Sequence, residues 1–119
     1  MIDDAKSLAI LARYAAGDRN FRDLDLDDQV YDFSNSNLRH AIFAGSFIIA
    51  SFRNADLEGA DFSNCNVKTC DFSEAKLNNV RFCGAALDAA NFDGADLSGS
   101  DFQGASVQGH VLSKGELPR

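Results

Sequence analysis

The fold is decided by the stretch from Ser51 to Gly109, which reads SFRNADLEGADFSNCNVKTCDFSEAKLNNVRFCGAALDAANFDGADLSGSDFQGASVQG. Every fifth residue in it, from Phe52 to Val107, is Phe, Leu or Val, and the residue two places earlier is mostly small. An α-helix repeats every 3.6 residues and a strand every 2, so neither gives a period of five. A short fixed repeat predicts a solenoid, in which each unit buries its apolar face by stacking on its neighbours.

The units NADLEGADF (54–62) and GADLSG (94–99) resemble the pentapeptide-repeat family, whose consensus is roughly A-(D/N)-L-x-x. The resemblance extends from about Phe21 to Gly109, and the segment from Arg13 to Phe21 is similar to cyanobacterial members. It implies an all-β solenoid, a right-handed quadrilateral β-helix with four pentads per coil. It also implies a protein-binding role, since the best understood members include DNA-mimicking inhibitors of DNA gyrase and a regulator of heterocyst differentiation.

With four pentads per coil, residues twenty apart stack on the same side, and the chain holds about five coils. Phe alternates with an aliphatic residue, so we expect Phe on two opposite sides of the square and Leu, Ile or Val on the other two. The expected inward Phe columns are Phe21, Phe43, Phe62, Phe82, Phe102 and Phe33, Phe52, Phe72, Phe92. The expected inward aliphatic columns are Leu26, Ile48, Val67, Leu87, Val107 and Leu38, Leu57, Leu77, Leu97.

Two spacings break this lattice. Leu26 and Phe33 are seven residues apart, and Ile48 and Phe52 are four apart. These spacings predict an insertion of two residues near 28–31 and a deletion of one residue near Ile49.

The last slot of most pentads is Gly or Asn, which tolerate the positive φ of tight turns. Thr69, Glu74 and Ala89 occupy this slot as well. At these three corners the sequence predicts a different type of turn.

The chain is expected to form a single domain over residues 1–119, with an N-terminal capping α-helix at about 4–16. Asp3 or Asp4 can cap its start and Gly17 its end. The apolar residues expected on its buried face are Leu8, Leu11, Ala12 and Ala15.

The coils are expected at about 19–112, with Leu112 in the last pentad. Regular stacking should stop near Gly109, because His110 would otherwise occupy a small inward slot. Residues 113–119 are expected to form a short tail.

The net charge of −7 argues against direct binding of nucleic acid, which requires patches of Lys and Arg, but it leaves room for a basic protein partner. No segment is long enough to cross a membrane, so no membrane partner is expected. Asp3 and Asp4 stand where a signal peptide would carry Lys or Arg, and three cysteines without motif spacing predict reduced thiols. A cytoplasmic location follows.

Catalytic, metal and cofactor sites are not predicted. Outward charges stack as Asp56, Lys76, Asp96 and as Asp61, Arg81, Asp101, which predicts solvated salt ladders and not a catalytic pair in a cleft. The stretch 23–28 resembles the start of a calcium loop, but Asp28 replaces the required Gly and Ser34 the required Glu, so an acidic rim is favoured. The inward thiols Cys65 and Cys70 and the outward Cys83 have no zinc-site spacing.

The clearest departure from the family pattern lies at Ile42, Phe47 and Ile49. With Phe43 and Ile48 inward, the lattice places these three side chains outside, where other pentads carry polar residues. They form a candidate protein-binding patch. The alternative is that the N-terminal helix or the neighbouring insertion covers them.

The favoured function is a non-enzymatic protein-interaction or scaffold module that acts by surface recognition, with an unidentified protein partner. The alternative is a DNA-mimicking inhibitor of DNA gyrase or of another DNA-binding protein, which rests on the resemblance and the negative charge. About five coils are short for a duplex mimic, and Lys76 and Arg81 dilute the charge on two sides. The expected oligomeric state is a monomer or a weak dimer through a coil end.

Overall fold

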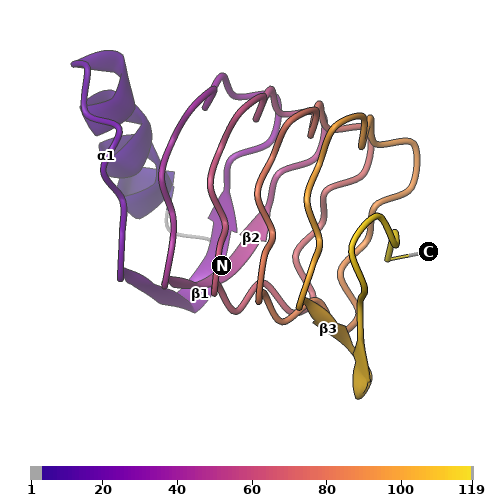
Figure 1. Cartoon of the computed structure of the whole chain (residues 1–119). Helices are drawn as coiled ribbons and strands as arrows, with labels where there is room; N and C mark the ends of the chain where they lie inside the picture. Colours follow the sequence, from indigo (N-terminus) through magenta and orange to yellow (C-terminus); the bar gives the residue numbers. More distant parts are fainter. Residues whose placement is uncertain (1–3, 119) are drawn as a thin grey trace.

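The computed structural model describes residues 4–118, and within them the chain forms a stack of coils with a helix at one end (Figure 1). The coils and the helix together measure 37 × 25 × 25 Å along the principal axes. Its regular elements are the helix α1 (Asp4–Ala15) and the strands β1 (Asp25–Asp32), β2 (Phe47–Ser51), β3 (Ser106–Val107) and β4 (His110–Val111). Most of the coil path between β2 and β3 consists of short bridges and turns.

Parallel backbone pairing joins residues twenty apart, as the lattice predicts, for example Asp61 to Arg81 and Arg81 to Asp101. The amide of Phe62 donates to the carbonyl of Arg81 in the next coil (2.7 Å), and the amide of Asp61 donates to the carbonyl of Ala41 in the preceding coil (3.0 Å). Each side of a coil therefore bonds to both neighbouring coils, and a turn every five residues makes the path four-sided.

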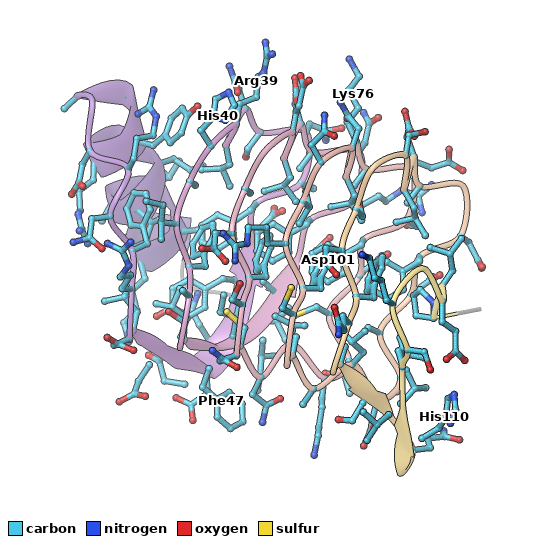
Figure 2. The ribbon with its side chains drawn as sticks, viewed as in Figure 1. Arg39, His40, Phe47, Lys76, Asp101 and His110 are labelled. Carbon is cyan, nitrogen blue, oxygen red and sulfur yellow. The ribbon has the colours of Figure 1, made fainter. Side chains whose placement is uncertain are left out.

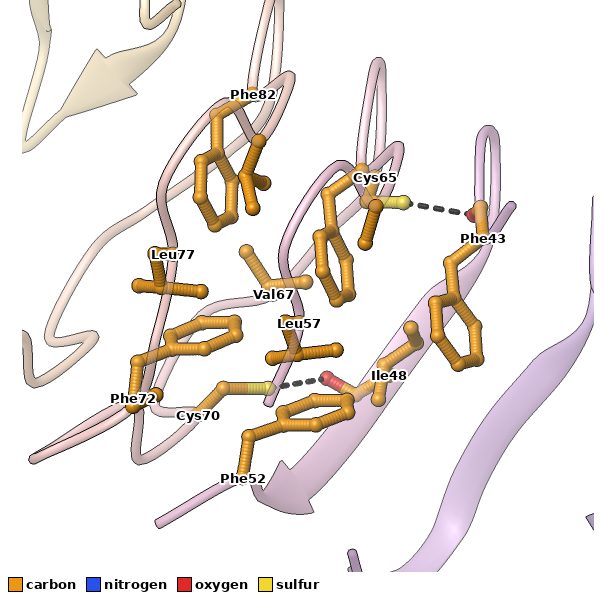
Figure 3. Close-up of a cluster of buried hydrophobic side chains, with 14 of the residues drawn as sticks. Phe43, Ile48, Phe52, Leu57, Cys65, Val67, Cys70, Phe72, Leu77 and Phe82 are labelled. Atoms are coloured by element: carbon orange, nitrogen blue, oxygen red, sulfur yellow. Dashed lines mark hydrogen bonds between the residues drawn. The ribbon is translucent and has the colours of Figure 1, made fainter. Parts of the chain in front are cut away.

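The Phe columns lie where the sequence predicts them, and they contact each other across the core (Figure 3). Within a column the rings of the regular coils stack nearly parallel: Phe72 lies 5.1 Å from Phe52 at 2° and 5.3 Å from Phe92 at 3°. Between columns the rings meet edge to face, with Phe62 and Phe72 5.6 Å apart at 83°. Both arrangements are favoured by the quadrupole of aromatic rings, so one ring can make favourable contacts with four neighbouring rings.

The aliphatic columns also point inward, and most of their members are fully buried. Val107 is the exception, since it is only half-buried and packs against the edge of the core.

The corners follow one conformation more closely than the sequence predicts. Thr69, Glu74 and Ala89 have φ of 64°, 59° and 60°, the same left-handed conformation as Gly59 at 70°. The prediction of a different turn type at these three corners is therefore wrong. Stacking of the coils imposes the conformation, although an L side chain pays for it with steric strain.

Both predicted breaks in the lattice occur, and they lie on top of each other. β1 and β2 pair in parallel, Leu26 with Ile48 and then Tyr31 with Ala50. Residues 27–30 of β1 therefore bulge opposite the single residue Ile49 of β2. The insertion in one coil and the deletion in the next change the same corner. Both coils cross this corner as extended strand instead of as a tight turn.

Helix α1 packs on β1, but with a different face from the predicted one. Ser7 and Ile10 are buried, and Leu11 and Tyr14 pack against the core; of the predicted face only Leu11 does so, because Leu8 is 60% exposed and Ala12 and Ala15 are exposed. The spacing 7, 10, 11, 14 is one helical stripe. The stripe was missed because its first member is polar: the Ser7 hydroxyl accepts the Asp32 amide of β1 at 3.0 Å.

Helix α1 ends at Ala15, and Gly17, with φ of 103°, forms its C-terminal cap as predicted. The Gly17 amide donates to the Tyr14 carbonyl (2.9 Å) and the Asp18 amide to the Arg13 carbonyl (3.0 Å), the pair of bonds of a Schellman motif. Asp4 begins the helix, whereas Asp3 lies outside the described residues.

At the other end the chain reverses instead of completing another pentad. β3 and β4 pair antiparallel, with Ser106 opposite Val111. The hairpin brings Leu112 back over the last coil, where it is buried and bonds to Ala105 (2.8 Å). The placement of Leu112 in a last regular pentad is therefore wrong, and His110 is exposed and pairs with Glu116 at 2.7 Å.

Candidate protein-interaction face

Most outward Asp and Asn side chains have a structural task. In the slot before each inward residue, the side-chain oxygen accepts the backbone amide two residues further on, as Asp61 does from Ser63 (2.8 Å) and Asn91 from Asp93 (2.9 Å). At Asp96 the bond from the Ser98 hydroxyl, and after it the bond from the Ser98 amide, keep the pKa of the carboxyl below its usual value. The acidic residues of the repeat therefore stabilise the sides of the coils, and their number alone does not mark a binding site.

The charged columns have the predicted order, but the ion pairs of the predicted salt ladders do not form among residues 4–118. Lys76 stacks between Asp56 and Asp96, and Arg81 between Asp61 and Asp101. Within residues 4–118, however, neither Lys76 nor Arg81 has a carboxylate oxygen within 4.0 Å. The ion pairs between coils are those of Arg39 with Glu58 (2.7 Å) and Asp56 (3.9 Å), and of Lys68 with Asp88 (3.8 Å).

The three candidate patch residues point outward but do not share one side. Phe47 stacks between Asp25 and Asn66, and its side chain is 39% exposed; in Figure 2 its ring projects away from the coils. Ile49 is half-buried on the same strand, opposite the bulge of β1. Ile42 is half-buried and lies on the adjacent side, around the corner at Gly45.

The bulge adds a residue that sequence reasoning missed. Val30 is 48% exposed and lies in the four-residue segment opposite Ile49. Its position inside the predicted insertion was the available signal, since an inserted residue has no inward slot to fill. We call the outward surface formed by Val30, Phe47, Ile49, Asp25 and Asp27 the β1–β2 face.

Helix α1 borders this region without burying Phe47. Lys6 pairs with Asp28 of the bulge, and the Tyr31 hydroxyl donates to the same carboxylate at 2.8 Å. Together they keep the pKa of Asp28 below its usual value, with the bond from Lys6 the larger cause. The helix thus fixes one edge of the bulge and leaves the β2 side accessible.

The inward thiols occupy the small slots as predicted and serve as hydrogen-bond donors. Cys65 donates to the Phe43 carbonyl (2.8 Å) and Cys70 to the Ile48 carbonyl (3.2 Å), as Figure 3 shows. Burial raises the pKa of each to about 12. Cys83 is half-exposed on the outside, and burial, followed by Asp101, raises its pKa as well. High pKa values make these thiols poor nucleophiles.

The described part of the chain, residues 4–118, contains no detectable pocket and no group of three or more His, Cys, Asp or Glu side chains placed to hold a metal ion. Over the same residues no helix is long and apolar enough to cross a membrane.

A four-sided stack of pentads with polar outward slots defines a solenoid repeat protein. The family described as "Pentapeptide repeat region" matches the sequence over residues 45–112. The chain therefore belongs to the pentapeptide repeat family, whose fold is the right-handed β-helix. No curated protein matches the sequence.

Solved structures support the fold. A pentapeptide repeat protein from the thylakoid lumen of Arabidopsis thaliana is 33% identical, with a TM-score of 0.61 over 76% of this chain and 67% of that chain. HetL, involved in heterocyst differentiation regulation in the cyanobacterium Nostoc, is 21% identical, with a TM-score of 0.50 over 78% of this chain and 49% of that one. QnrB1, a plasmid-mediated fluoroquinolone resistance protein, is 23% identical, with a TM-score of 0.55 over 76% and 47%. This chain thus spans about half the length of the latter two.

Proposed function

We propose that this protein is a non-enzymatic interaction module, a rigid rod of about five coils capped by α1, which binds a protein partner through the β1–β2 face. The observation that carries the proposal is Phe47. An aromatic side chain 39% exposed occupies a slot that holds Asn66 in the next coil and Asp25 in the preceding one. A large exposed apolar side chain is a frequent anchor of protein interfaces.

The position of the face adds to this argument. Phe47 and Ile49 belong to a five-residue strand that pairs with β1, so their backbone is held by the coil stack and not by a flexible loop. A rigid anchor loses little conformational entropy on binding. Ile42 lies around the corner, where it can extend the contact to a partner that wraps the edge.

The test compares two variants that each add one negative charge in the same type of slot. Phe47→Asp alters the face, and Asn91→Asp alters an exposed slot on another side. Immobilised wild-type protein and both variants are used for affinity capture from the native cytosol. A partner that is lost only with Phe47→Asp supports the proposal, whereas identical captured proteins with all three would contradict it.

The alternative is DNA mimicry directed at DNA gyrase or another DNA-binding protein, which the net charge of −7 favours. Against it, Lys76 and Arg81 interrupt two acidic columns in the middle of the rod. A DNA supercoiling assay at micromolar protein decides between the two: inhibition by the wild type that persists in Phe47→Asp would support mimicry.

We further propose a cytoplasmic location and a monomer, or a weak dimer through a coil end. Cys65 and Cys70 act as thiol donors, which suits a reducing compartment. Val111, 61% exposed on the terminal hairpin, is the apolar residue that such a dimer would bury. Light scattering over a range of concentrations measures the oligomeric state.

A further inference from the structure

We propose that the β1–β2 face binds a basic amphipathic segment, a stretch of a partner protein in which Lys or Arg flanks bulky apolar side chains. This inference rests on the proposed function and specifies the chemistry of its partner.

The centre of the face is apolar and exposed. Phe47 and Val30 are 39% and 48% exposed, and Ile49 of β2 is half-buried opposite the bulge. An apolar partner side chain placed here removes this surface from water, which supplies the favourable free energy of contact.

The rim of the face carries two carboxylates, those of Asp25 and Asp27. Asp25 pairs in register with Phe47 and is therefore its immediate neighbour in the preceding coil, and Asp27 lies in the bulge. Both are exposed, and across residues 4–118 neither has a Lys or Arg nitrogen within 4.0 Å.

The two lysines nearest in the chain lattice are already engaged. Lys6 of α1 pairs with Asp28, and Lys68, which follows Ile49 in the next coil, pairs with Asp88 one coil further on. Among residues 4–118, no Lys or Arg therefore forms an ion pair with Asp25 or Asp27.

These charges select the partner. A purely apolar partner would desolvate carboxylates without pairing them, and an acidic one would add repulsion, so both lose affinity. A membrane surface with anionic lipids and a nucleic acid are disfavoured by the same sign of charge. A protein segment with Lys or Arg beside its apolar anchors satisfies both parts of the face.

The test uses the full chain and two fluorescent amphipathic peptides with the same apolar spacing, one of Leu and Lys and one of Leu and Glu. Fluorescence anisotropy gives the affinity of each for the wild type, Phe47→Asn, Asp25→Asn/Asp27→Asn and the control Asp96→Asn/Asp101→Asn. The control also removes two negative charges, but at the opposite end of the stack, and it keeps an amide oxygen as acceptor in each slot.

We expect the Leu/Lys peptide to bind the wild type, and Phe47→Asn and Asp25→Asn/Asp27→Asn each to weaken binding by about tenfold, or 1.4 kcal/mol. The control should change affinity by less than about twofold, and salt should weaken wild-type binding more than that of Asp25→Asn/Asp27→Asn. Val30→Asn removes a second exposed apolar side chain of the face, and we expect it to weaken binding of the Leu/Lys peptide as well.

Different results overturn different parts. Equal binding of the Leu/Glu peptide, or equal losses in the two double variants, would refute the basic partner while the face itself stands through Phe47. Binding of the Leu/Lys peptide that is unaffected by Phe47→Asn and Val30→Asn would contradict the face and the proposed function with it. No binding of the Leu/Lys peptide would also refute the basic partner.

Discussion

The regular coils and the β1–β2 segment follow the same inward lattice but differ in what they present outside. In the regular coils, outward Asp and Asn accept local backbone amides, as Asp61 and Asn91 do, and the corners turn tightly every five residues. In the β1–β2 segment one corner is straightened in two successive coils, and an exposed Phe47 replaces the polar residue. The difference teaches that inward positions specify this fold, while the outward positions of irregular coils are free to acquire a binding role.

The comparison predicts the largest stability loss in the middle of the regular coils. Phe72→Ala removes a fully buried ring that stacks on Phe52 and Phe92 and meets Phe62 and Phe82 edge to face. Because the rigid coils cannot collapse onto the cavity, we expect a loss of about 3–5 kcal/mol in the free energy of unfolding. Urea denaturation measures it, and a loss below about 1 kcal/mol would show that the ring columns do not support the fold.

The buried thiols predict a loss of stability at alkaline pH. Burial raises the pKa of Cys65 and Cys70 from 9.0 to about 12, so their stabilising contribution is complete below pH 9 and falls as the pH rises toward 12. In that window, ionisation of each thiol in the unfolded chain should lower the free energy of unfolding by about 1.4 kcal/mol per pH unit. Cys65→Ser/Cys70→Ser should flatten this part of the stability profile, since Ser46 donates to a carbonyl from an equivalent small slot.

Cys83→Ser is the matched control for the thiol prediction, because Cys83 is half-exposed. Unfolding free energies of the three proteins between pH 8 and 11 check it. If the double variant loses stability as steeply as the wild type above pH 9, the two thiols are not the groups that titrate.

A smaller effect is expected where α1 meets the irregular segment. Ser7→Ala leaves the Asp32 amide without its acceptor at a position where Ser7 is 2% exposed. We expect a loss of about 1–2 kcal/mol and faster hydrogen exchange at Asp32. Leu8→Ala, on the exposed side of the same helix, is the control, since Ala raises helix propensity in both variants. An equal loss of stability in both would show that the Ser7 bond is not responsible.

The corners predict a gain. Thr69 is a β-branched residue with φ of 64°, so Thr69→Gly relieves strain and should stabilise the fold by about 1 kcal/mol, less the entropy that Gly adds to the unfolded chain. Gly99→Ala, which builds the reverse change at φ of 73° and brings a Cβ against the Asn79 side chain, should destabilise it. Thermal unfolding measures both, and a lower Tm in Thr69→Gly would count against corner strain.

Sequence reasoning reached the inward lattice because a period of five leaves each inward side chain in one environment. For this reason the sequence predicts the Phe columns, the inward positions of Cys65 and Cys70 and the two breaks in the lattice, whereas the stacking of the breaks on each other emerged from the structure. It failed where a neighbouring coil overrides a local preference. Thr69 and Ala89 do not favour positive φ, yet the stack above and below imposes it.

The ends were harder, because no repeat constrains them. The buried stripe of α1 begins with Ser7, a polar residue whose partner on β1 could not be known from spacing, and the reversal that buries Leu112 has no counterpart in the lattice. For the candidate face, the outward positions of Phe47 and Ile49 were predictable from the lattice. That Ile42 lies on the adjacent side, and that Val30 belongs to the face, depends on the geometry of the corners.

The most direct test of the central claim, that Phe47 serves recognition and not stability, is the unfolding free energy of Phe47→Asn measured together with its affinity for the Leu/Lys peptide. Asn occupies the equivalent slot at Asn66, so we expect stability within about 0.5 kcal/mol of the wild type and a tenfold weaker affinity. A loss of more than about 1 kcal/mol with unchanged affinity would show that Phe47 supports the fold, and it would contradict this account.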